Sequence, residues 1–286
     1  MKQIEIGYQK TCACKPNHLN CMTPKEWIKS QLGVWHFAYE KRDVRDKTIH
    51  PAVFPVRMAE QVISLFTHKG ELVLDPFSGI GTTSLAAKAL ERNSVGFDIN
   101  EKYIEFAKKR VSQQTLTNDI KAALICDDAN AIEKYLKPES VKLIFTSPPY
   151  ANLLNRERRN KSRRGVGRKN DQFMKVEQYS QDPRDLGTMA MGPYNEAMTE
   201  IFRKMSPLLN PKGHCVINVP DMYWEGKRIP IHIHVVHALE AAGFELKNTI
   251  IWDRTNIVNS IGIFGWPSNY ITMGTTFEYL LDFIKK

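Results

Sequence analysis

The amino-acid sequence predicts an α/β fold with an open sheet, on three observations. A short apolar run ends in a glycine turn that leads into a helix over 71–90. A second apolar strand, 94–99, ends next to an acid, and a third, 143–146, is followed by two prolines. Strands that alternate with helical segments are typical of sheets that bind ligands at the carboxyl ends of their strands.

Apolar periodicity and end signals predict the other elements in chain order. A helix begins after Thr23, because Thr23, Pro24 and Glu26 supply an N-cap, a proline at the first position and an acid at the third. The other expected helices are 56–66, 101–114, 194–209 and 231–242. The other expected strands are 122–126, 215–219, 244–253 and 276–284. The charged run 41–47 is expected to be exposed.

The first strand, turn and helix have the composition of a ligand-binding segment. Leu72 to Leu74 form the strand, and Gly79 and Gly81 follow in the loop. Glycines let the backbone approach a ligand closely, and unpaired N–H groups at the start of the next helix can bind it. Asp98, at the end of the second strand, stands where such folds hold the hydroxyls of a ribose.

The spacing of this turn narrows the class of ligand. The glycines are spaced G-x-G, and Ser84 occupies the place of the third glycine in a dinucleotide-binding motif. The loop also lacks the lysine of the phosphate-binding loops that hydrolyse nucleoside triphosphates. An adenosine-bearing ligand without phosphates therefore fits the turn better.

The strand 143–146 is followed by Ser147-Pro148-Pro149-Tyr150. Two prolines cannot continue the hydrogen-bond ladder of a sheet, so they fix a stiff, extended turn above it. A rigid carbonyl, a hydroxyl acceptor and an aromatic face suit a flat ring that carries an amino group. The acceptors would orient the NH2 group, and the tyrosine would stack on the ring.

Together, the segments 75–83 (DPFSGIGTT) and 146–150 (TSPPY) resemble the S-adenosylmethionine-dependent DNA methyltransferases that modify exocyclic amino groups. Related patterns extend over roughly 50–286. The resemblance implies a Rossmann-like methyltransferase fold with a mostly parallel seven-stranded sheet, a C-terminal antiparallel hairpin and helices on both faces. It also implies S-adenosyl-L-methionine as the cofactor.

The resemblance gives roles to the residues that match the family's motifs. Asp128 would accept a hydrogen bond from the adenine amino group of the cofactor, a role that a helix cap can share. The segment 50–55 would lie against the methionine end. The expected cofactor-binding residues are His50, Pro51, Phe54, Asp75, Pro76, Phe77, Gly79, Gly81, Thr82, Asp98 and Asp128. The expected catalytic residues are Ser147, Pro148, Pro149 and Tyr150.

The reaction that these residues predict is methyl transfer to a base taken out of the DNA duplex, because an amino group inside the stack cannot be reached. No covalent nucleophile is required, and the crevice has no Pro-Cys pair. In the resembled family, a serine at the position of Ser147 tends to accompany cytosine, so N4-cytosine is favoured over N6-adenine. An RNA methyltransferase and a non-enzymatic nucleic-acid-binding module are the rival hypotheses.

One segment holds most of the positive charge. The net charge of the chain is +9, and residues 156–170 contain eight basic residues and one acidic residue. Because this run closely follows Tyr150, we expect it to contact DNA phosphates, although a charge run can also be a solvated face. The expected DNA-binding residues are Arg156, Arg158, Arg159, Lys161, Arg163, Arg164, Arg168 and Lys169. They lie in a segment of little apolar periodicity, 151–192, which is expected to be an insertion for DNA recognition.

The composition is that of an ordinary soluble globular protein, with 42% apolar and 25% charged residues. The chain has no run of about 18 apolar residues and does not begin with a signal peptide, so we expect a cytoplasmic protein without a membrane partner. The expected partner is double-stranded DNA, and a cognate restriction endonuclease is a further candidate. A monomer and a homodimer are both compatible with the sequence.

Residues 1–49 are expected to form an N-terminal arm that contacts DNA or binds zinc, ahead of a catalytic domain over 50–286. Cys12, Cys14, His18 and Cys21 follow the pattern C-x-C-x3-H-x2-C. Four such side chains can hold zinc, but the spacing is not a common zinc-finger pattern. Reduced thiols are therefore the favoured interpretation, and no metal is expected. The odd number of cysteines, five, also argues against a disulfide framework.

Overall fold

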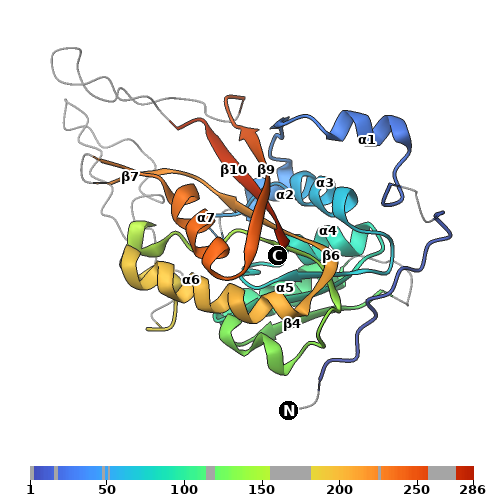
Figure 1. Ribbon diagram of the computed structural model, residues 1–286, viewed down its shortest axis with the longest axis horizontal. Coiled ribbons are helices and arrows are strands. Elements are labelled where there is room, and N and C mark those ends of the chain that lie inside the picture. The colour runs from blue at the N-terminus through green and yellow to red at the C-terminus, as the bar shows by residue number, and fades with distance from the viewer. Residues whose placement is uncertain are drawn as a thin grey trace.

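The computed structural model describes residues 3–15, 19–46, 49–50, 52–113, 120–154, 182–224, 227–256 and 275–286. In these residues, eight strands form one mixed sheet with helices on both of its faces (Figure 1). A two-stranded hairpin, β7 (Met222–Trp224) with β8 (Lys227–Ile229), lies outside this sheet. None of the helices in this part of the chain is long and apolar enough to cross a membrane.

The strand order of the main sheet is β1-β9-β10-β6-β5-β2-β3-β4. The strands are β1 (Val34–His36), β2 (Leu72–Asp75), β3 (Asn93–Asp98), β4 (Ala122–Cys126), β5 (Val141–Thr146), β6 (Leu209–Val219), β9 (Phe244–Asp253) and β10 (Phe277–Lys285). β10 runs antiparallel to β6 and β9, and the other neighbours are parallel. The predicted mostly parallel sheet with a C-terminal antiparallel hairpin is therefore confirmed.

The sheet has one strand more than predicted. β1 pairs in parallel with β9, and Trp35 lies opposite Trp252 in this register. Both indole side chains are almost completely buried. A segment expected in the N-terminal arm thus forms the edge strand of the catalytic sheet.

Both faces of the sheet are covered by helices. The α-helices are α1 (Pro24–Ser30), α2 (Lys41–Asp46), α3 (Val56–Phe66), α4 (Thr82–Ala89), α5 (Glu101–Ser112), α6 (Met191–Met205) and α7 (Ile231–Ala241). Leu72 and Leu74 of β2 belong to the same core cluster as apolar residues of α6 and α7, whereas Val73 belongs to the cluster that includes those of α3, α4 and α5. A central strand between two helical layers must be apolar at every position, which explains the continuous apolar run in the sequence.

The expected exposure of the charged run 41–47 is wrong for two of its residues. Asp43 and Asp46, both in α2, are buried. The Asp43 carboxylate accepts hydrogen bonds from the backbone N–H groups of Glu40 (2.9 Å) and Val56 (3.3 Å). Asp46 pairs with Arg110 of α5 at 2.5 Å. These acids are buried because each has a specific partner elsewhere in the fold.

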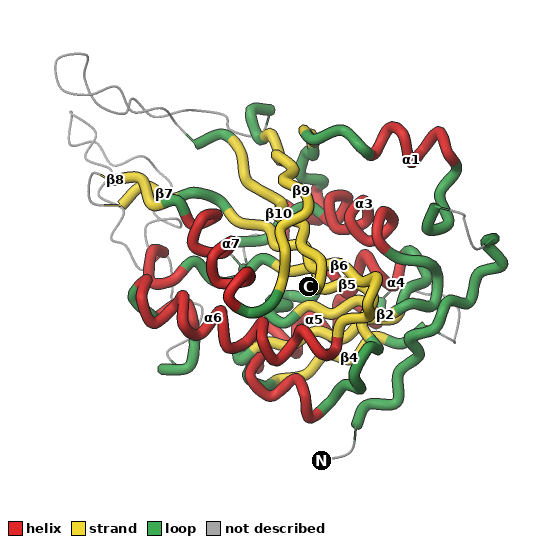
Figure 2. The backbone as a smooth tube through the Cα atoms, viewed as in Figure 1, coloured by secondary structure: helices red, strands yellow, loops and turns green. Residues whose placement is uncertain are grey.

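The chain before α1 is an extended loop that runs along the edge of the molecule (Figure 2). The backbone N–H of Ile4 donates to the carbonyl of Tyr135 at 3.0 Å, and that of Thr11 donates to the carbonyl of Lys69 at 2.8 Å. α1 then begins with the predicted capping box between Thr23 and Glu26. The described part of the arm is therefore hydrogen-bonded at two points to loops of the folded body.

Candidate active site

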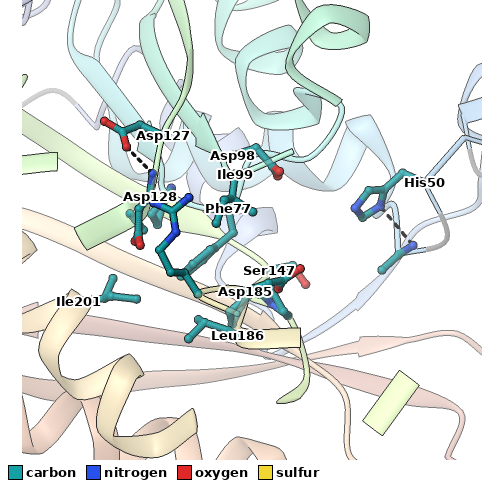
Figure 3. Close-up of a pocket in the computed structure, with 16 residues that line it drawn as sticks. His50, Phe77, Asp98, Ile99, Asp127, Asp128, Ser147, Asp185, Leu186 and Ile201 are labelled. Atoms are coloured by element: carbon teal, nitrogen blue, oxygen red, sulfur yellow. Dashed lines mark hydrogen bonds between the residues drawn. The ribbon is translucent and has the colours of Figure 1, made fainter. Parts of the chain in front are cut away.

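A pocket with about 680 Å³ of empty space, part of it open to solvent, lies at the carboxyl ends of β2, β3, β4 and β5 (Figure 3). The close-up shows His50 on the side opposite Asp127 and Asp128. Segments that are far apart in the sequence thus meet at the edge of the sheet where open α/β folds bind ligands.

The glycine turn after β2 has the backbone that its sequence predicts. Gly79 and Gly81 have φ values of +49° and +75°, in the left-handed region that glycine adopts without strain. Gly81 is the N-cap of α4. A Cβ atom at Gly79 would lie 3.2 Å from Nε2 of His50. The turn therefore lets the backbone pass close to one wall of the pocket.

Asp75 fixes this turn from within. Its carboxylate accepts hydrogen bonds from the hydroxyls of Thr83 and Thr146, both at 2.6 Å, and from the backbone N–H of Phe77 at 3.2 Å. Burial raises the pKa of the Asp75 carboxyl to about 6, although the hydrogen bonds act in the opposite direction. Asp75 does not line the pocket. Its geometry is that of a residue that holds the loop, β5 and α4 together, while Pro76 and Phe77 next to it face the ligand space.

Asp98 lines the pocket at the end of β3. One carboxylate oxygen accepts from the backbone N–H of Gly79 and the other from that of Asn100, both at 2.8 Å. Burial raises the pKa of Asp98 to about 7, against the lowering effect of these two hydrogen bonds. Its protonation state is therefore sensitive to pH near neutrality.

Two further acids line the pocket after β4. Asp128 caps the 3-10 helix η1 (Ala129–Lys134), and its carboxylate accepts from the backbone N–H of Asn130 at 2.8 Å. Asp127 accepts from the hydroxyl of Tyr135 at 2.6 Å and from the backbone N–H of Asp128 at 2.8 Å. The predicted capping by Asp128 is present, in a residue that also faces the ligand space.

Three of the four expected catalytic residues, Ser147, Pro148 and Pro149, line the pocket after β5. The hydroxyls of Ser147 and Tyr150 lie 2.8 Å apart in a hydrogen bond. Tyr150 itself is 7% exposed and packs in the hydrophobic core, so its ring lies behind the pocket wall. In this conformation, the hydroxyl acceptor is presented to the pocket and the aromatic face is not.

His50 forms the opposite wall. Its Nδ1 atom accepts a hydrogen bond from the backbone N–H of Ala52 at 3.3 Å, and its ring meets that of Tyr103 edge-on at 4.7 Å. Burial lowers the pKa of His50 to about 4. The imidazole is therefore neutral at pH 7 and adds no positive charge to the site.

Other expected cofactor-binding residues lie beside the pocket and do not line it. Phe54 is buried against Phe145, with ring centroids 5.2 Å apart. The hydroxyl of Thr82 accepts a hydrogen bond from Arg110 at 3.0 Å. Pro51, His18 and the expected DNA-binding residues 156–169 lie outside the described residues.

Arg110 connects the two walls of the pocket. Besides Thr82, its guanidinium donates to the backbone carbonyl of Ile80 at 3.1 Å, within the glycine turn. It also pairs with Asp46, four residues before His50. One buried side chain of α5 thus holds both the turn after β2 and the end of the helix that leads to His50.

The segment 182–188 was not predicted to reach the pocket. Arg184 and Asp185 line it, ahead of the 3-10 helix η4 (Leu186–Thr188). Arg184 forms a two-pronged pair with Asp182 at 2.7 and 3.0 Å. Asp185 is 5% exposed, and its Oδ2 atom is buried without a hydrogen-bond partner. Asp127 is a third pocket residue that was not predicted.

The charge of the lining fits S-adenosylmethionine. Four aspartates, Asp98, Asp127, Asp128 and Asp185, face one arginine, Arg184, and no described lysine lines the pocket. The ligand offers hydroxyl and amino donors together with positive charge, which carboxylates accept and stabilise. The orphaned oxygen of Asp185 is an acceptor that such a ligand would satisfy. A phosphate-bearing ligand would be repelled by the same residues.

Comparisons with known proteins agree with this fit. A family model described as a DNA methylase matches residues 1–109, and one described as a methyltransferase domain matches residues 67–251, more than half of the chain. The type II methyltransferase M.BglI of Bacillus subtilis is 31% identical over 128 residues, which cover 44% of this chain and 36% of the relative. The orphan methyltransferase M.BamHII of Bacillus amyloliquefaciens is 39% identical over 113 residues, which cover 38% and 42%. The chain thus spans less than half the length of these curated relatives.

Two solved structures share the fold at low sequence identity. TrmN from Thermus thermophilus has a TM-score of 0.50 at 16% identity and covers 84% of this chain and 52% of its own. A putative rRNA-methylase from Clostridium thermocellum has the same TM-score and identity and covers 81% and 97%. The chain therefore belongs to the family of proteins with this methyltransferase domain, and its N-terminal part is similar to the DNA methylase family.

Proposed function

We propose that the protein transfers a methyl group to the exocyclic amino group of a base in double-stranded DNA, and that this base is cytosine, methylated at N4. One observation supports the proposal above all. Ser147 and the two prolines after β5 line the same pocket as the carboxylates of Asp98 and Asp128. A group of hydrogen-bond acceptors for an amino group therefore adjoins a site suited to the cofactor.

Three residues of the pocket, Asp98, Asp128 and His50, would lie next to the cofactor. Asp98 would accept hydrogen bonds from the ribose hydroxyls, and Asp128 from the adenine amino group. His50, neutral because of its low pKa, can lie near a positively charged sulfonium without repelling it. When bound, S-adenosyl-L-methionine supplies an electrophilic methyl group.

Ser147 and Pro148 would orient the amino group of the base. The hydroxyl oxygen of Ser147 and the carbonyl of Pro148 accept its two N–H bonds, which draws the nitrogen towards a tetrahedral geometry and exposes its lone pair for in-line attack. The nitrogen lone pair would bond to the methyl carbon as the carbon–sulfur bond of the donor breaks. The sulfur would keep that electron pair as a neutral thioether, and the nitrogen would release one proton to solvent. Most of the acceleration comes from orientation and from these preorganised dipoles.

Tyr150 would stack on the base after it has left the duplex. Because its ring is buried and its hydroxyl bonds to Ser147, this role requires the side chain to turn towards the pocket when the base enters. The assignment of cytosine rests on the serine at position 147 and on family analogy, and it is the part of the proposal that the experiment below tests most directly.

DNA binding is proposed for the basic residues of 156–169, which lead into the segment that carries Arg184 to the pocket. Their guanidinium and ammonium groups would contact phosphates, and the insertion 151–192 would recognise the target within a catalytic domain over 50–286. Two of the curated relatives are named type II methyltransferases. A cognate restriction endonuclease is still only a predicted partner. Whether the protein acts as a monomer or as a homodimer is also still a prediction.

The test is to incubate the protein with unmodified genomic DNA and S-adenosylmethionine labelled in the methyl group, digest the DNA to nucleosides and separate them. We expect labelled N4-methylcytosine. Ser147→Ala should abolish the label, whereas Ser112→Ala, at an exposed serine of α5, should leave it unchanged. Labelled N6-methyladenine would overturn the choice of cytosine, and label found only in added RNA would overturn DNA as the substrate.

A further inference from the structure

Three cysteines of the N-terminal arm meet a histidine from the body of the protein. The sulfur atoms of Cys12, Cys14 and Cys21 and a ring nitrogen of His68 all lie within 4.8 Å of one another. Nδ1 of His68 is 3.3 Å from the sulfur of Cys12 and 3.4 Å from that of Cys21. The sulfurs of Cys14 and Cys21 are 3.5 Å apart, and all three thiols are free.

These distances match those around a tetrahedral zinc ion. Zinc binds thiolate sulfur at about 2.3 Å and imidazole nitrogen at about 2.0 Å, so its ligands are separated by about 3.5 to 3.8 Å. Three of the separations, 3.3, 3.4 and 3.5 Å, are close to these values, and all of them are at most 4.8 Å. A disulfide, by contrast, requires sulfur atoms about 2 Å apart. The ligand atoms are arranged around a common centre rather than as a bonded pair.

We infer that Cys12, Cys14, Cys21 and His68 form a structural zinc site. Thiolate and imidazole ligands in a four-coordinate arrangement select zinc, and binding releases the protons of the three thiols. His68 takes the place that the sequence pattern gives to His18. The four protein ligands complete the coordination and leave no open position, which is typical of a structural site rather than a catalytic one.

The segment around His68 is held in place by other contacts. The backbone N–H of His68 donates to the carboxylate of Glu71 at 2.6 Å, and Lys69 accepts from the N–H of Thr11 at 2.8 Å. Gly70 has a φ value of +84°, and a Cβ atom there would lie 2.6 Å from the carbonyl oxygen of Gln9. Both the histidine and the cysteine arm are thus positioned by hydrogen bonds and close packing that do not depend on the metal.

The place of the cluster in the fold supports a structural role. His68 lies in the turn between α3 and β2, and β2 begins at Leu72. The pocket lies at the other end of β2, beyond Asp75. Since the cluster and the reacting groups are at opposite ends of the sheet, the metal would tie the arm to the catalytic body without taking part in the transfer.

The experiment measures zinc by mass spectrometry in the full-length protein, purified without chelator and without a histidine tag. We expect one zinc per chain. His68→Ala and Cys21→Ser should lose it. His18→Ala should keep it, as should Cys126→Ser, at an exposed cysteine outside the cluster. Comparison of His68→Ala with His18→Ala tests which histidine is the fourth ligand: the one that lies next to the cysteines in the fold, or the one that lies between them in the sequence.

A second measurement needs only the unaltered chain, in case a variant does not fold. The metal is replaced by Co²⁺, and the absorption spectrum should show thiolate charge transfer and tetrahedral ligand-field bands. Absence of metal from the wild-type protein, a disulfide between Cys14 and Cys21, or retention of zinc by His68→Ala together with its loss from His18→Ala would each overturn the assignment.

Discussion

The two ends of β2 are built in different ways. At its carboxyl end, Asp75 and the glycine turn follow the strand directly, and the pocket draws on neighbouring strand ends that each continue a short motif. At its amino end, Cys21 meets His68 across 47 positions of sequence. Much of the first site comes from short motifs at strand ends that the sequence shows, whereas the second site depends on how the arm lies on the folded body.

The pocket and the cysteine cluster are subject to different constraints. The pocket residues have to meet the chemistry of a ligand, so their types and spacing are fixed locally by the turn that presents them. The cysteine cluster has only to fix an arm, and any histidine that the fold brings within reach can complete it. Experiments that affect one end and spare the other therefore test whether the two ends are independent.

The largest expected effect is on the free energy of unfolding, and it comes from the zinc site at the amino end of β2. Zinc should stabilise the wild-type protein by about 4 kcal/mol when it is held at 1,000 times its dissociation constant. His68→Ala should lose this dependence, and His18→Ala should retain it. Thermal unfolding with and without a chelator measures the effect. The rate of methyl transfer by the folded fraction should be unchanged, and a comparable fall in that rate would show that the two ends are not independent.

The second-largest effect is expected at the carboxyl end of the sheet, where removal of the Tyr150 ring should lower catalytic efficiency. Tyr150→Ala should reduce kcat/KM roughly 10- to 100-fold, because base stacking is worth about 1–3 kcal/mol. Tyr150→Phe keeps the ring and removes the hydroxyl that bonds to Ser147, so it should stay closer to the wild type. Calorimetry should show little change in cofactor affinity for either variant. Equal losses in both variants would assign the role to the hydroxyl instead.

A smaller effect is expected from the protonation of Asp98. Burial raises its pKa to about 7, so the carboxylate becomes charged as the pH rises through neutrality. Cofactor affinity should therefore increase, up to about tenfold, between pH 6 and pH 8, since one pKa unit corresponds to about 1.4 kcal/mol. The pKa of His50, about 4, keeps its imidazole neutral throughout this range.

The matched variant is Asp98→Asn, which should bind the cofactor weakly and with little dependence on pH. The raised pKa of Asp98 affects folding stability in the opposite direction to cofactor affinity. Because the carboxyl holds its proton more tightly in the folded chain, its contribution to stability decreases as the pH rises from about 4 to about 7. A pH profile of Asp98→Asn identical to that of the wild type would exclude this residue as the source.

The smallest effect per residue is expected in the basic insertion. Arg163→Gln with Arg164→Gln should lower the salt dependence of DNA binding by about two phosphate contacts, a change of about 1.8 in slope. Lys108→Gln with Lys109→Gln, at two exposed residues of α5, removes the same charge elsewhere and should change the slope little. Fluorescence anisotropy over a salt series measures both, and equal slopes for the two pairs would refute a specific role for the insertion.

The sequence predicted the elements whose signals are local. α3 and β9 begin and end at the predicted residues, because each is a long periodic segment between clear end signals. β1 was not predicted as a strand, since it has only three residues and becomes a strand by pairing with β9. Asp43 and Asp46 were expected to be exposed because they belong to a charged run, whose sequence does not show that Asp43 binds the N–H group of Val56 or that Asp46 pairs with Arg110.

The same distinction applies to the pocket. Asp98, Asp128 and Ser147 stand at predicted strand ends, and the structure brings them together. Arg184 and Asp185 follow a segment without apolar periodicity, so nothing in their neighbourhood predicted their contact with the site. The position of Tyr150 behind the wall also depends on packing that no motif encodes.

Arg110 can couple the two walls of the pocket energetically, because it bonds to both of them. Its guanidinium bonds to the glycine turn and pairs with the helix that leads to His50, so ordering one wall favours order in the other. Linkage is reciprocal: if a ligand at one wall raised affinity at the other through Arg110, a ligand at the second wall would raise affinity at the first by the same factor. Cooperativity between two ligands can therefore arise here without any contact between them.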